Sequence, residues 1–469
     1  MRSFERVNIV LRGVTAVVLL SVIASAAPRY VAYAEVSDVL TALSGLVPAE
    51  LKSGDTIRAG EWPDWAGRYD RRIRSRIAAG DQETVVNWLL FGTTFTKQPR
   101  VPLDELGGAS PRRRLTDVQV ANLIGDRTVD LVTALANPGQ DERRIFARDL
   151  FANQGYTLAA PPDRLRLIQH LLQLVTDVTT ERARLAKETE AIRRLDDTSE
   201  QFAARSKLFR DRGLSADTSF RPNFALERAL ATMKDKGTLR SGSIREIAVI
   251  GPGLDFADKA SGYDFYPQQT LQPFALIDSL VRLGIVADGR MLHVTTLDLS
   301  PRVNAHLRTM NQRAQAGQPY RIRLPLNPDA PWQPDVLAYW KSVGDRIASP
   351  SPAVATIVNG EKVNVRTLAV RPDIAARIDA DDLNVVVQRL DQPKFDLIVA
   401  TNVFIYYDLL DQALAMTNVR AMLRRGGFLL SNNSMPVLPG SGMQSVGYVT
   451  VQYSSLQDDG DHVVWYRAE

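Results

Sequence analysis

The sequence has no cysteine and only four histidines in 469 residues. Without cysteine, disulfides, thiolate nucleophiles and thiolate metal sites are excluded. The histidines, His170, His293, His306 and His462, do not pair at metal-ligand spacing, and neither H-E-x-x-H nor G-x-S-x-G is present. We therefore expect neither a zinc hydrolase nor a serine esterase, and no metal site.

A strong net charge is also missing. The formal net charge is +4 for the whole chain, and it falls to +1 when residues 1–34 are left out. A protein that binds nucleic acid ordinarily carries a clustered basic face. The nearly neutral body of the chain gives no indication of nucleic-acid binding.

The apolar segment near the N-terminus, residues 13–27, is shorter than the roughly 20 residues that span a bilayer. Three arginines precede it, and an A-x-A sequence follows at Ala32–Ala34. This pattern predicts that residues 1–34 are a signal peptide and that the protein is exported to the periplasm or the extracellular space. Two alternatives are an uncleaved membrane anchor through residues 13–27 and a buried N-terminal helix.

Residues 35–236 are predicted to form a mainly α-helical domain. Apolar residues recur near a period of 3.6 between Leu115 and Leu135, and Pro162 suits the first turn of a long helix. The stretch from Glu61 to Arg76 mixes aromatic and arginine side chains, a composition that is enriched at interfaces. This helical half is therefore expected to pack through its aromatic residues, with binding of a protein partner as the alternative.

Residues 237–469 alternate short apolar runs with helical patterns. Such alternation predicts an α/β fold with a doubly wound, mostly parallel, Rossmann-like sheet. The last two apolar runs have no helix between them, so we expect a terminal antiparallel hairpin. An Asn359-Gly360 turn between β-rich runs predicts a β-hairpin insertion around residues 319–370. The predicted strands are Glu246–Ile250, Leu292–Asp298, Val363–Val370, Phe395–Ala400, Gly427–Ser431, Gly447–Tyr453 and His462–Tyr466, and the predicted helices are Leu271–Leu283, Pro301–Gln315, Asp373–Ile378 and Leu409–Leu423.

Ligands of an open α/β sheet bind outside the carboxyl ends of its strands. Gly251 and Gly253 follow the first predicted strand and allow a ligand to approach the backbone. Asp298 ends the second strand, where a carboxylate can accept hydrogen bonds from ribose hydroxyls. The strand Phe395–Ala400 leads into Asn402, Tyr406, Tyr407 and Asp408.

The spacing of these residues discriminates between nucleotide cofactors. A dinucleotide site carries a third glycine, whereas positions 251–256 read Gly-Pro-Gly-Leu-Asp-Phe. Asp298 also lies 47 positions beyond Gly251, far from the roughly 20 of the dinucleotide fingerprint. An NAD-linked oxidoreductase is therefore disfavoured.

Residues 243–469 resemble the class I S-adenosylmethionine-dependent methyltransferases. The stretches "DADDLNVVVQRL", "FDLIVATNVFIYYD" and "VRAMLRRGGFLLSN" look most like the catalytic domain of chemotaxis-receptor glutamate methyltransferases. The resemblance implies S-adenosylmethionine as cofactor. It implies that Gly251 and Gly253 line the methionine part of the cofactor, Asp298 holds the ribose, Leu299 contacts the adenine, Asp382 and Leu383 lie at the adenine edge, Asn402 lies near the methionine end, and Tyr406 lies in the substrate-facing loop.

These features predict methyl transfer from S-adenosylmethionine to an unknown acceptor, a small molecule or a protein. Asn402, Tyr406 and Asp408 are the candidate catalytic residues, and Tyr406 or Asp408 would assist if the acceptor must lose a proton. Asn402 and the tyrosines could instead have capping or packing roles. The alternative function is an exported, non-catalytic binding module, because the cofactor is made in the cytosol and Val249 occupies a position that is usually acidic in class I methyltransferases.

Overall fold

The computed structural model describes residues 27–469, except for 103–114, 195–203, 205–206, 210–211, 259–261, 327–330, 351, 359, 436, 439–440 and 457–458. Its centre is a seven-stranded sheet with the order β10-β5-β4-β12-β13-β15-β14. The strands are β4 (Glu246–Ile250), β5 (His293–Asp298), β10 (Ile378–Asp382), β12 (Phe395–Ala400), β13 (Leu423–Ser431), β14 (Met443–Gln452) and β15 (Gly460–Ala468).

Strands β10, β5, β4, β12 and β13 are parallel, whereas β15 is antiparallel to both β13 and β14. The order runs outward from β4 in both directions, which is the arrangement of a doubly wound sheet. The structure therefore confirms the predicted mostly parallel sheet and its terminal antiparallel hairpin.

The central strands are buried on both faces of the sheet. In β4, Ile247 and Val249 belong to one hydrophobic core, and Ala248 and Ile250 belong to the core on the opposite face. This is why the strand is continuously apolar in sequence, as is usual for parallel strands covered by helices. The first core is covered mainly by α7 (Arg221–Asp235), α8 (Gln272–Arg282), α9 (Pro301–Gln315) and α10 (Pro334–Ser342), and the second by α1 (Ser37–Ala42), the start of α2 (Trp62–Phe91) and α12 (Leu409–Met422).

The predicted hairpin insertion is a separate antiparallel sheet. Its strands are β6 (Tyr320–Leu326), β7 (Ala348–Pro350), β8 (Val354–Val358) and β9 (Glu361–Val370). Strand β9 pairs with all three others, and Val358 lies opposite Glu361 at the turn between β8 and β9. Asn359, on which the turn was predicted, lies outside the described residues.

The edge strand β10 was not predicted. A short helix, α11 (Pro372–Ala375), replaces the expected helix Asp373–Ile378, and β10 begins at Ile378 itself. The sequence of β10, Ile-Asp-Ala-Asp-Asp, has little intrinsic preference for a strand. The strand conformation of β10 is instead stabilised by pairing with β5, since Ile378 to Asp382 lie in register with Val294 to Asp298.

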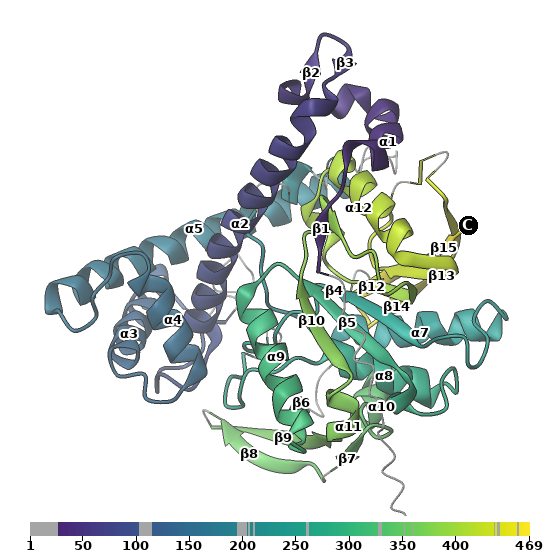
Figure 1. Cartoon of the computed structure of the whole chain (residues 1–469). Coiled ribbons are helices and arrows are strands. Elements are labelled where there is room, and N and C mark those ends of the chain that lie inside the picture. The colour runs from purple at the N-terminus through teal and green to yellow at the C-terminus, as the bar shows by residue number, and fades with distance from the viewer. Residues whose placement is uncertain are drawn as a thin grey trace, which may run out of the picture.

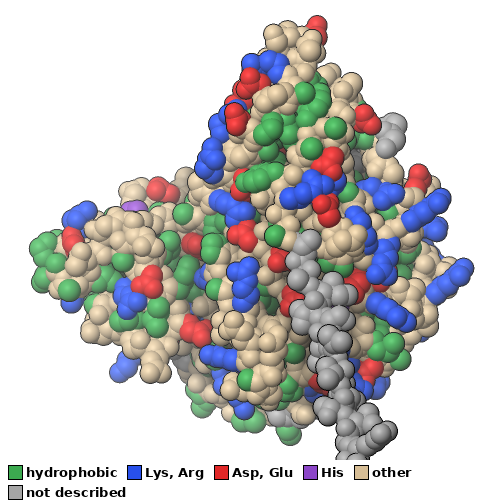
Figure 2. Space-filling model, in the orientation of Figure 1, with side chains coloured by type: hydrophobic (Ala, Val, Ile, Leu, Met, Phe, Trp, Pro, Cys, Tyr) green, Lys and Arg blue, Asp and Glu red, His purple; other side chains and the backbone are tan. Residues whose placement is uncertain are grey.

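The helical half forms a lobe beside the sheet (Figure 1). It consists of the C-terminal part of α2 with α3 (Asp117–Ala136), α4 (Glu142–Ala152) and α5 (Pro161–Arg193), packed around a third hydrophobic core. In Figure 2 the surface is hollowed between this lobe and the body that carries the sheet.

Helix α2 joins the lobe to the sheet. Its early residues, among them Trp62, Trp65 and Tyr69, pack in a core of the sheet, whereas Val85 and Trp88 belong to the core of the lobe. Helix α7, which precedes the predicted domain boundary at 236, packs against the sheet. The hydrophobic cores of the molecule therefore do not separate at residue 236, although the mainly helical character of residues 35–236 is as predicted.

The N-terminal segment that follows residue 26 is part of the fold. Strand β1 (Arg29–Tyr30) pairs with β11 (Gln388–Arg389), and Val31 is buried and accepts a hydrogen bond from the indole of Trp62 at 2.8 Å. The predicted A-x-A sequence Ala32–Ala34 thus follows directly on residues that are held by the sheet domain. Of the apolar segment 13–27, all but Ala27 lies outside the described residues, and none of the helices within the described ranges combines the length and apolarity needed to cross a membrane.

Candidate functional site

The carboxyl ends of β4, β5 and β12 meet at one cavity of about 290 Å³. The cavity is lined by Gly251, Asp298 and Asn402. The first and the last of these are 151 positions apart in the sequence. This volume is at the lower end of the roughly 300–1,000 Å³ that is usual for ligand sites. The sheet therefore brings together the three residues that the sequence placed at separate strand ends.

The glycine loop after β4 depends on its missing side chains. Gly251 and Gly253 have φ angles of +67° and +61°, in the left-handed region that favours glycine. A Cβ atom on Gly253 would lie 2.8 Å from the backbone oxygen of Ala216. The loop is therefore both conformationally special and closely covered by another segment of the chain.

Asp298 is held at the end of β5 by backbone donors. The amide of Ser300 donates to its carboxylate at 2.8 Å, and the backbone of Gly253 also donates to it. Burial raises the pKa of Asp298 to about 6, against the effect of these hydrogen bonds. The carboxylate is therefore ionised at neutral pH and oriented towards the glycine loop.

Two leucines give the same cavity an apolar wall. Leu299 and Leu383 both line it, together with Val385. Asp382, predicted beside Leu383, does not line the cavity and instead forms an ion pair with Arg74 of α2 at 2.7 Å. The predicted adenine edge therefore consists of apolar side chains, and Asp382 connects the sheet to the helical half.

Asn402 has a φ angle of +57°. Every other residue with a positive φ in the described part of the chain is a glycine. The backbone amide of Asn402 donates to Oδ1 of Asn432 at 2.8 Å. In return, Nδ2 of Asn432 donates to Oδ1 of Asn402 at 2.8 Å. Asparagine tolerates this backbone conformation better than most residues. The paired amides fix the loop after β12 while Asn402 itself remains exposed at the cavity.

The two other predicted catalytic residues have different positions. Tyr406 lines the cavity, packs edge-on against Phe209, and has its pKa raised by burial. Asp408 does not line the cavity; it is the N-cap of α12, where its Oδ1 accepts from the amide of Asp411 at 3.0 Å. The structure thus assigns the carboxylate of Asp408 to helix capping.

The sequence did not predict the roof of the cavity, which is formed by residues 214–219 with Ile77 of α2. Backbone hydrogen bonds hold this roof segment between α2 and the glycine loop: Leu214 donates to Arg76 at 3.0 Å and Leu254 donates to Ala216 at 2.8 Å. Gly80 is the available sequence signal, because a glycine inside a helix often marks close packing. A Cβ atom there would lie 1.9 Å from the oxygen of Leu214.

Asp217 brings a second carboxylate from the roof segment to the cavity. Its Oδ2 accepts from the hydroxyl of Thr84 at 2.8 Å, and its Oδ1 lies 3.6 Å from the guanidinium of Arg302. Arg302 also lies 3.4 Å from Asp81 of α2. The helical half therefore contributes charged groups, as well as apolar cover, to the site.

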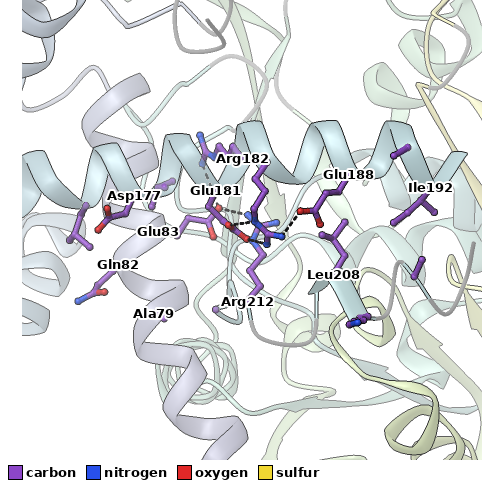
Figure 3. Close-up of a pocket in the computed structure, with 17 residues that line it drawn as sticks. Ala79, Gln82, Glu83, Asp177, Glu181, Arg182, Glu188, Ile192, Leu208 and Arg212 are labelled. Carbon is purple, nitrogen blue, oxygen red and sulfur yellow. Dashed lines mark hydrogen bonds and ion pairs between the residues drawn. The ribbon is translucent and has the colours of Figure 1, made fainter. Parts of the chain in front are cut away.

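A second cavity, of about 740 Å³, lies between α2 and α5 (Figure 3). Ion pairs join most of its charged side chains: Glu83 pairs with Arg182 and Arg212, and Arg184 pairs with Glu181 and Glu188. None of the predicted site residues lines it. Its charges therefore connect parts of the helical lobe to one another.

No group of three or more histidine, aspartate or glutamate side chains in the described ranges is arranged to hold a metal ion. The candidate site accordingly consists of the glycine loop, Asp298, the apolar wall, the loop after β12 and the roof segment.

Comparison with known proteins addresses this same part of the chain. Residues 355–438 match the family model "CheR methyltransferase, SAM binding domain". The matched segment includes Asp382, Leu383, Asn402 and Tyr406, and it ends before the terminal hairpin. No curated protein matches the chain.

Solved methyltransferase structures are similar to the chain at low identity. The N-methyltransferase NodS from Bradyrhizobium japonicum WM9 is 14% identical over 52% of this chain and 96% of NodS, with a TM-score of 0.26. The glycopeptide N-methyltransferase MtfA complexed with S-adenosylmethionine is 13% identical over 54% of this chain and 97% of MtfA, with a TM-score of 0.28. Magnesium protoporphyrin IX methyltransferase from Synechocystis PCC 6803 is 11% identical over 52% of this chain and 79% of that enzyme, with a TM-score of 0.26.

At these TM-scores the assignment depends on the family match and on the sheet itself. The match confirms the resemblance to the chemotaxis methyltransferases that the sequence predicted. The family match supports a class I S-adenosylmethionine-dependent methyltransferase domain in the sheet-forming part of the chain, with S-adenosylmethionine as its cofactor.

Proposed function

We propose that the protein transfers the methyl group of S-adenosylmethionine to an acceptor at the cavity above β4, β5 and β12. The observation that carries this proposal is the meeting of Gly251, Asp298 and Asn402 at one cavity. When bound, the cofactor supplies a methyl group on a positively charged sulfur, which is already electrophilic. The remaining task of the protein is to bind, orient and shield the reacting groups.

The residues present fit this cofactor. Asp298 offers an ionised acceptor for ribose hydroxyls, and Leu299, Leu383 and Val385 provide an apolar surface for the adenine. Gly251 lies directly against the loop after β12, since a Cβ atom there would lie 2.6 Å from the side chain of Val403. The methionine end would then lie between the glycine loop and Asn402.

The ionisable groups of the cavity bear on the class of acceptor. Burial raises the pKa of both Tyr406 and Tyr407, so neither hydroxyl is ionised near neutral pH. Asp408 is committed to helix capping, and Asp217 is bonded to Thr84. The site therefore favours an acceptor that is a nucleophile without losing a proton first, such as a carboxylate.

The proposed alternative is an exported binding module that retains the fold without catalysis. It is favoured by the basic and apolar residues before position 27 and by Val249, which is buried in the sheet core and cannot replace a carboxylate at the cavity. Should a leader be removed, the packing of residues 29–31 favours a cut before Arg29.

Calorimetric titration of the full chain with S-adenosylmethionine tests the proposal. We expect saturable binding, and we expect Asp298→Ala to weaken it by roughly 10- to 100-fold, as for loss of a hydrogen bond to a charged group. Absence of binding up to about 1 mM cofactor would favour the non-catalytic alternative. Binding without loss in Asp298→Ala would remove Asp298 from the site.

A further inference from the structure

A third cavity, of about 800 Å³, lies between the helical lobe and the sheet domain. It is lined by residues of α4, α9 and β6, which are labelled in Figure 1. We call this cavity the arginine groove, after four of its lining residues, Arg302, Arg313, Arg321 and Arg323. It differs from the cofactor cavity in its size, its position and its charge.

The arginine groove has an excess of positive charge. Its described lining residues include four arginines and a single acidic residue, Glu142. Arg302 lies near Asp81 and Asp217, but Arg313, Arg321 and Arg323 form no ion pair with any acidic residue in the described part of the chain. Three arginines therefore line the groove without an ion-pair partner in the described part of the chain.

The cavity between α2 and α5 shows what structural arginines look like in this protein. There, Arg184 forms ion pairs with Glu181 at 2.6 Å and with Glu188 at 2.7 Å. The arginines of that cavity pair with glutamates of the same lobe, whereas Arg313, Arg321 and Arg323 of the arginine groove do not. Fold stabilisation accounts for the first set and leaves the second without a role.

The centre of the arginine groove is neutral and rigid. Nε2 of His306 lies 2.8 Å from the hydroxyl of Tyr320, which also accepts from the amide of Thr270 at 2.8 Å. Tyr320 stacks on Phe274 with ring centroids 5.1 Å apart. Burial, with Arg302 and Arg313 nearby, lowers the pKa of His306 to about 4, so this histidine is neutral at pH 7.

The arginine groove and the cofactor cavity share a wall. Leu254 lines the first and Gly253 the second, and Arg302 of the groove lies 3.6 Å from Asp217 of the cofactor cavity. The two cavities are therefore separate, and both can be occupied at once.

We propose that the arginine groove binds a small organic molecule that carries two or more anionic groups. A guanidinium group matches carboxylate and phosphate oxygens through paired hydrogen bonds, which makes arginine the usual residue for such ligands. The volume is within the range of small-molecule sites, and the four arginines line one cavity. This inference does not depend on methyl transfer.

Calorimetry on the full chain tests the arginine groove, with pyrophosphate and citrate as the two probes. We expect at least one probe to bind with a stoichiometry of one, and the stronger probe identifies a phosphorylated or a polycarboxylate ligand. S-adenosylmethionine at saturation should not displace the probe.

The double variant Arg313→Ala/Arg321→Ala removes two exposed side chains and should preserve the fold. We expect this variant to bind the probe with an affinity lower by about tenfold for each arginine removed. Arg425→Ala, which removes another exposed arginine outside the groove, is the matched control and should bind normally. Failure of both probes to bind, displacement by the cofactor, or unchanged affinity in the double variant would overturn the proposal.

Discussion

Asp298 is the residue whose ionisation the proposed cofactor site depends on most. Its pKa is raised from 3.8 to about 6 by burial, so it loses its charge when the pH falls through about 6. A protonated carboxyl group accepts hydrogen bonds less well, and we expect cofactor affinity to decrease as the pH is lowered from about 7.5 to about 5. Calorimetric titrations with S-adenosylmethionine across this pH range measure the affinity, and the affinity of Asp298→Asn should not depend on pH in the same way. An equal pH response in the variant would show that another group is responsible.

Gly253 offers a second test at the scale of one residue. Gly253→Ala would place a Cβ atom 2.8 Å from Ala216 at a φ angle of +61°. We expect a loss of unfolding free energy greater than the roughly 1–2 kcal/mol of left-handed strain alone.

Gly139→Ala is the matched control for Gly253→Ala, because Gly139 has a φ angle of +58° and no atom within 4 Å of its Cβ position. Thermal or denaturant unfolding of both variants separates strain from contact with the roof segment. Equal losses of stability would mean that the roof segment does not press on the glycine loop.

Sequence reasoning located residues of the cavity where chemistry and strand ends coincide. Gly251, Asp298 and Asn402 could be found because each follows an apolar strand, and the topology brings strand ends together. Asp382 and Asp408 show the limit: both are carboxylates at the expected positions, but an arginine from α2 and the N-terminus of α12 engage them. Partners that are distant in sequence, or a helix cap, decide such cases.

At the scale of elements, β1 makes the clearest contribution that sequence patterns did not predict. A two-residue strand has no periodicity to recognise, and it was assigned to the predicted signal peptide. In the fold, Arg29 pairs with Glu35 and Asp391, and Tyr30 donates to Asp70 at 2.9 Å. The same segment supplies the acceptor of the buried Trp62 indole.

Truncation tests the contribution of β1 to stability. A chain that begins at Ala27 retains β1, whereas one that begins at Glu35 loses it. We expect the shorter chain to lose about 3 kcal/mol of unfolding free energy, from burial of Val31 and the unpaired indole of Trp62. Thermal unfolding of the two chains measures the difference. Equal stability would contradict a structural role for residues 29–34.

Strand β10 and the roof segment were missed for different reasons. Strand β10 is polar because it is an edge strand whose aspartates reach outward: Asp379 lies 2.8 Å from His293 and Asp382 pairs with Arg74. The roof segment has no regular structure, and it is positioned by Arg76 and Leu254. In both cases the structure is set by contacts between distant parts of the chain, which local sequence patterns do not contain.

At the scale of the whole molecule, the helical half and the sheet domain are built as one unit. Asp264 of the sheet half accepts from the indole of Trp88 at 2.5 Å and from the amide of Thr93 at 2.7 Å. Helix α2 runs through cores of both parts, and the roof of the cofactor cavity comes from the helical half. The helical half is therefore needed to complete the site.

A crystal structure of the full chain with S-adenosylhomocysteine tests the central claim most directly. We expect the adenosyl group in the cavity above β4, β5 and β12, with ribose hydroxyls within hydrogen-bond distance of Asp298 and the adenine against Leu299 and Leu383. Electron density for the ligand at another place, or a cavity closed by the roof segment with no ligand bound, would contradict the account.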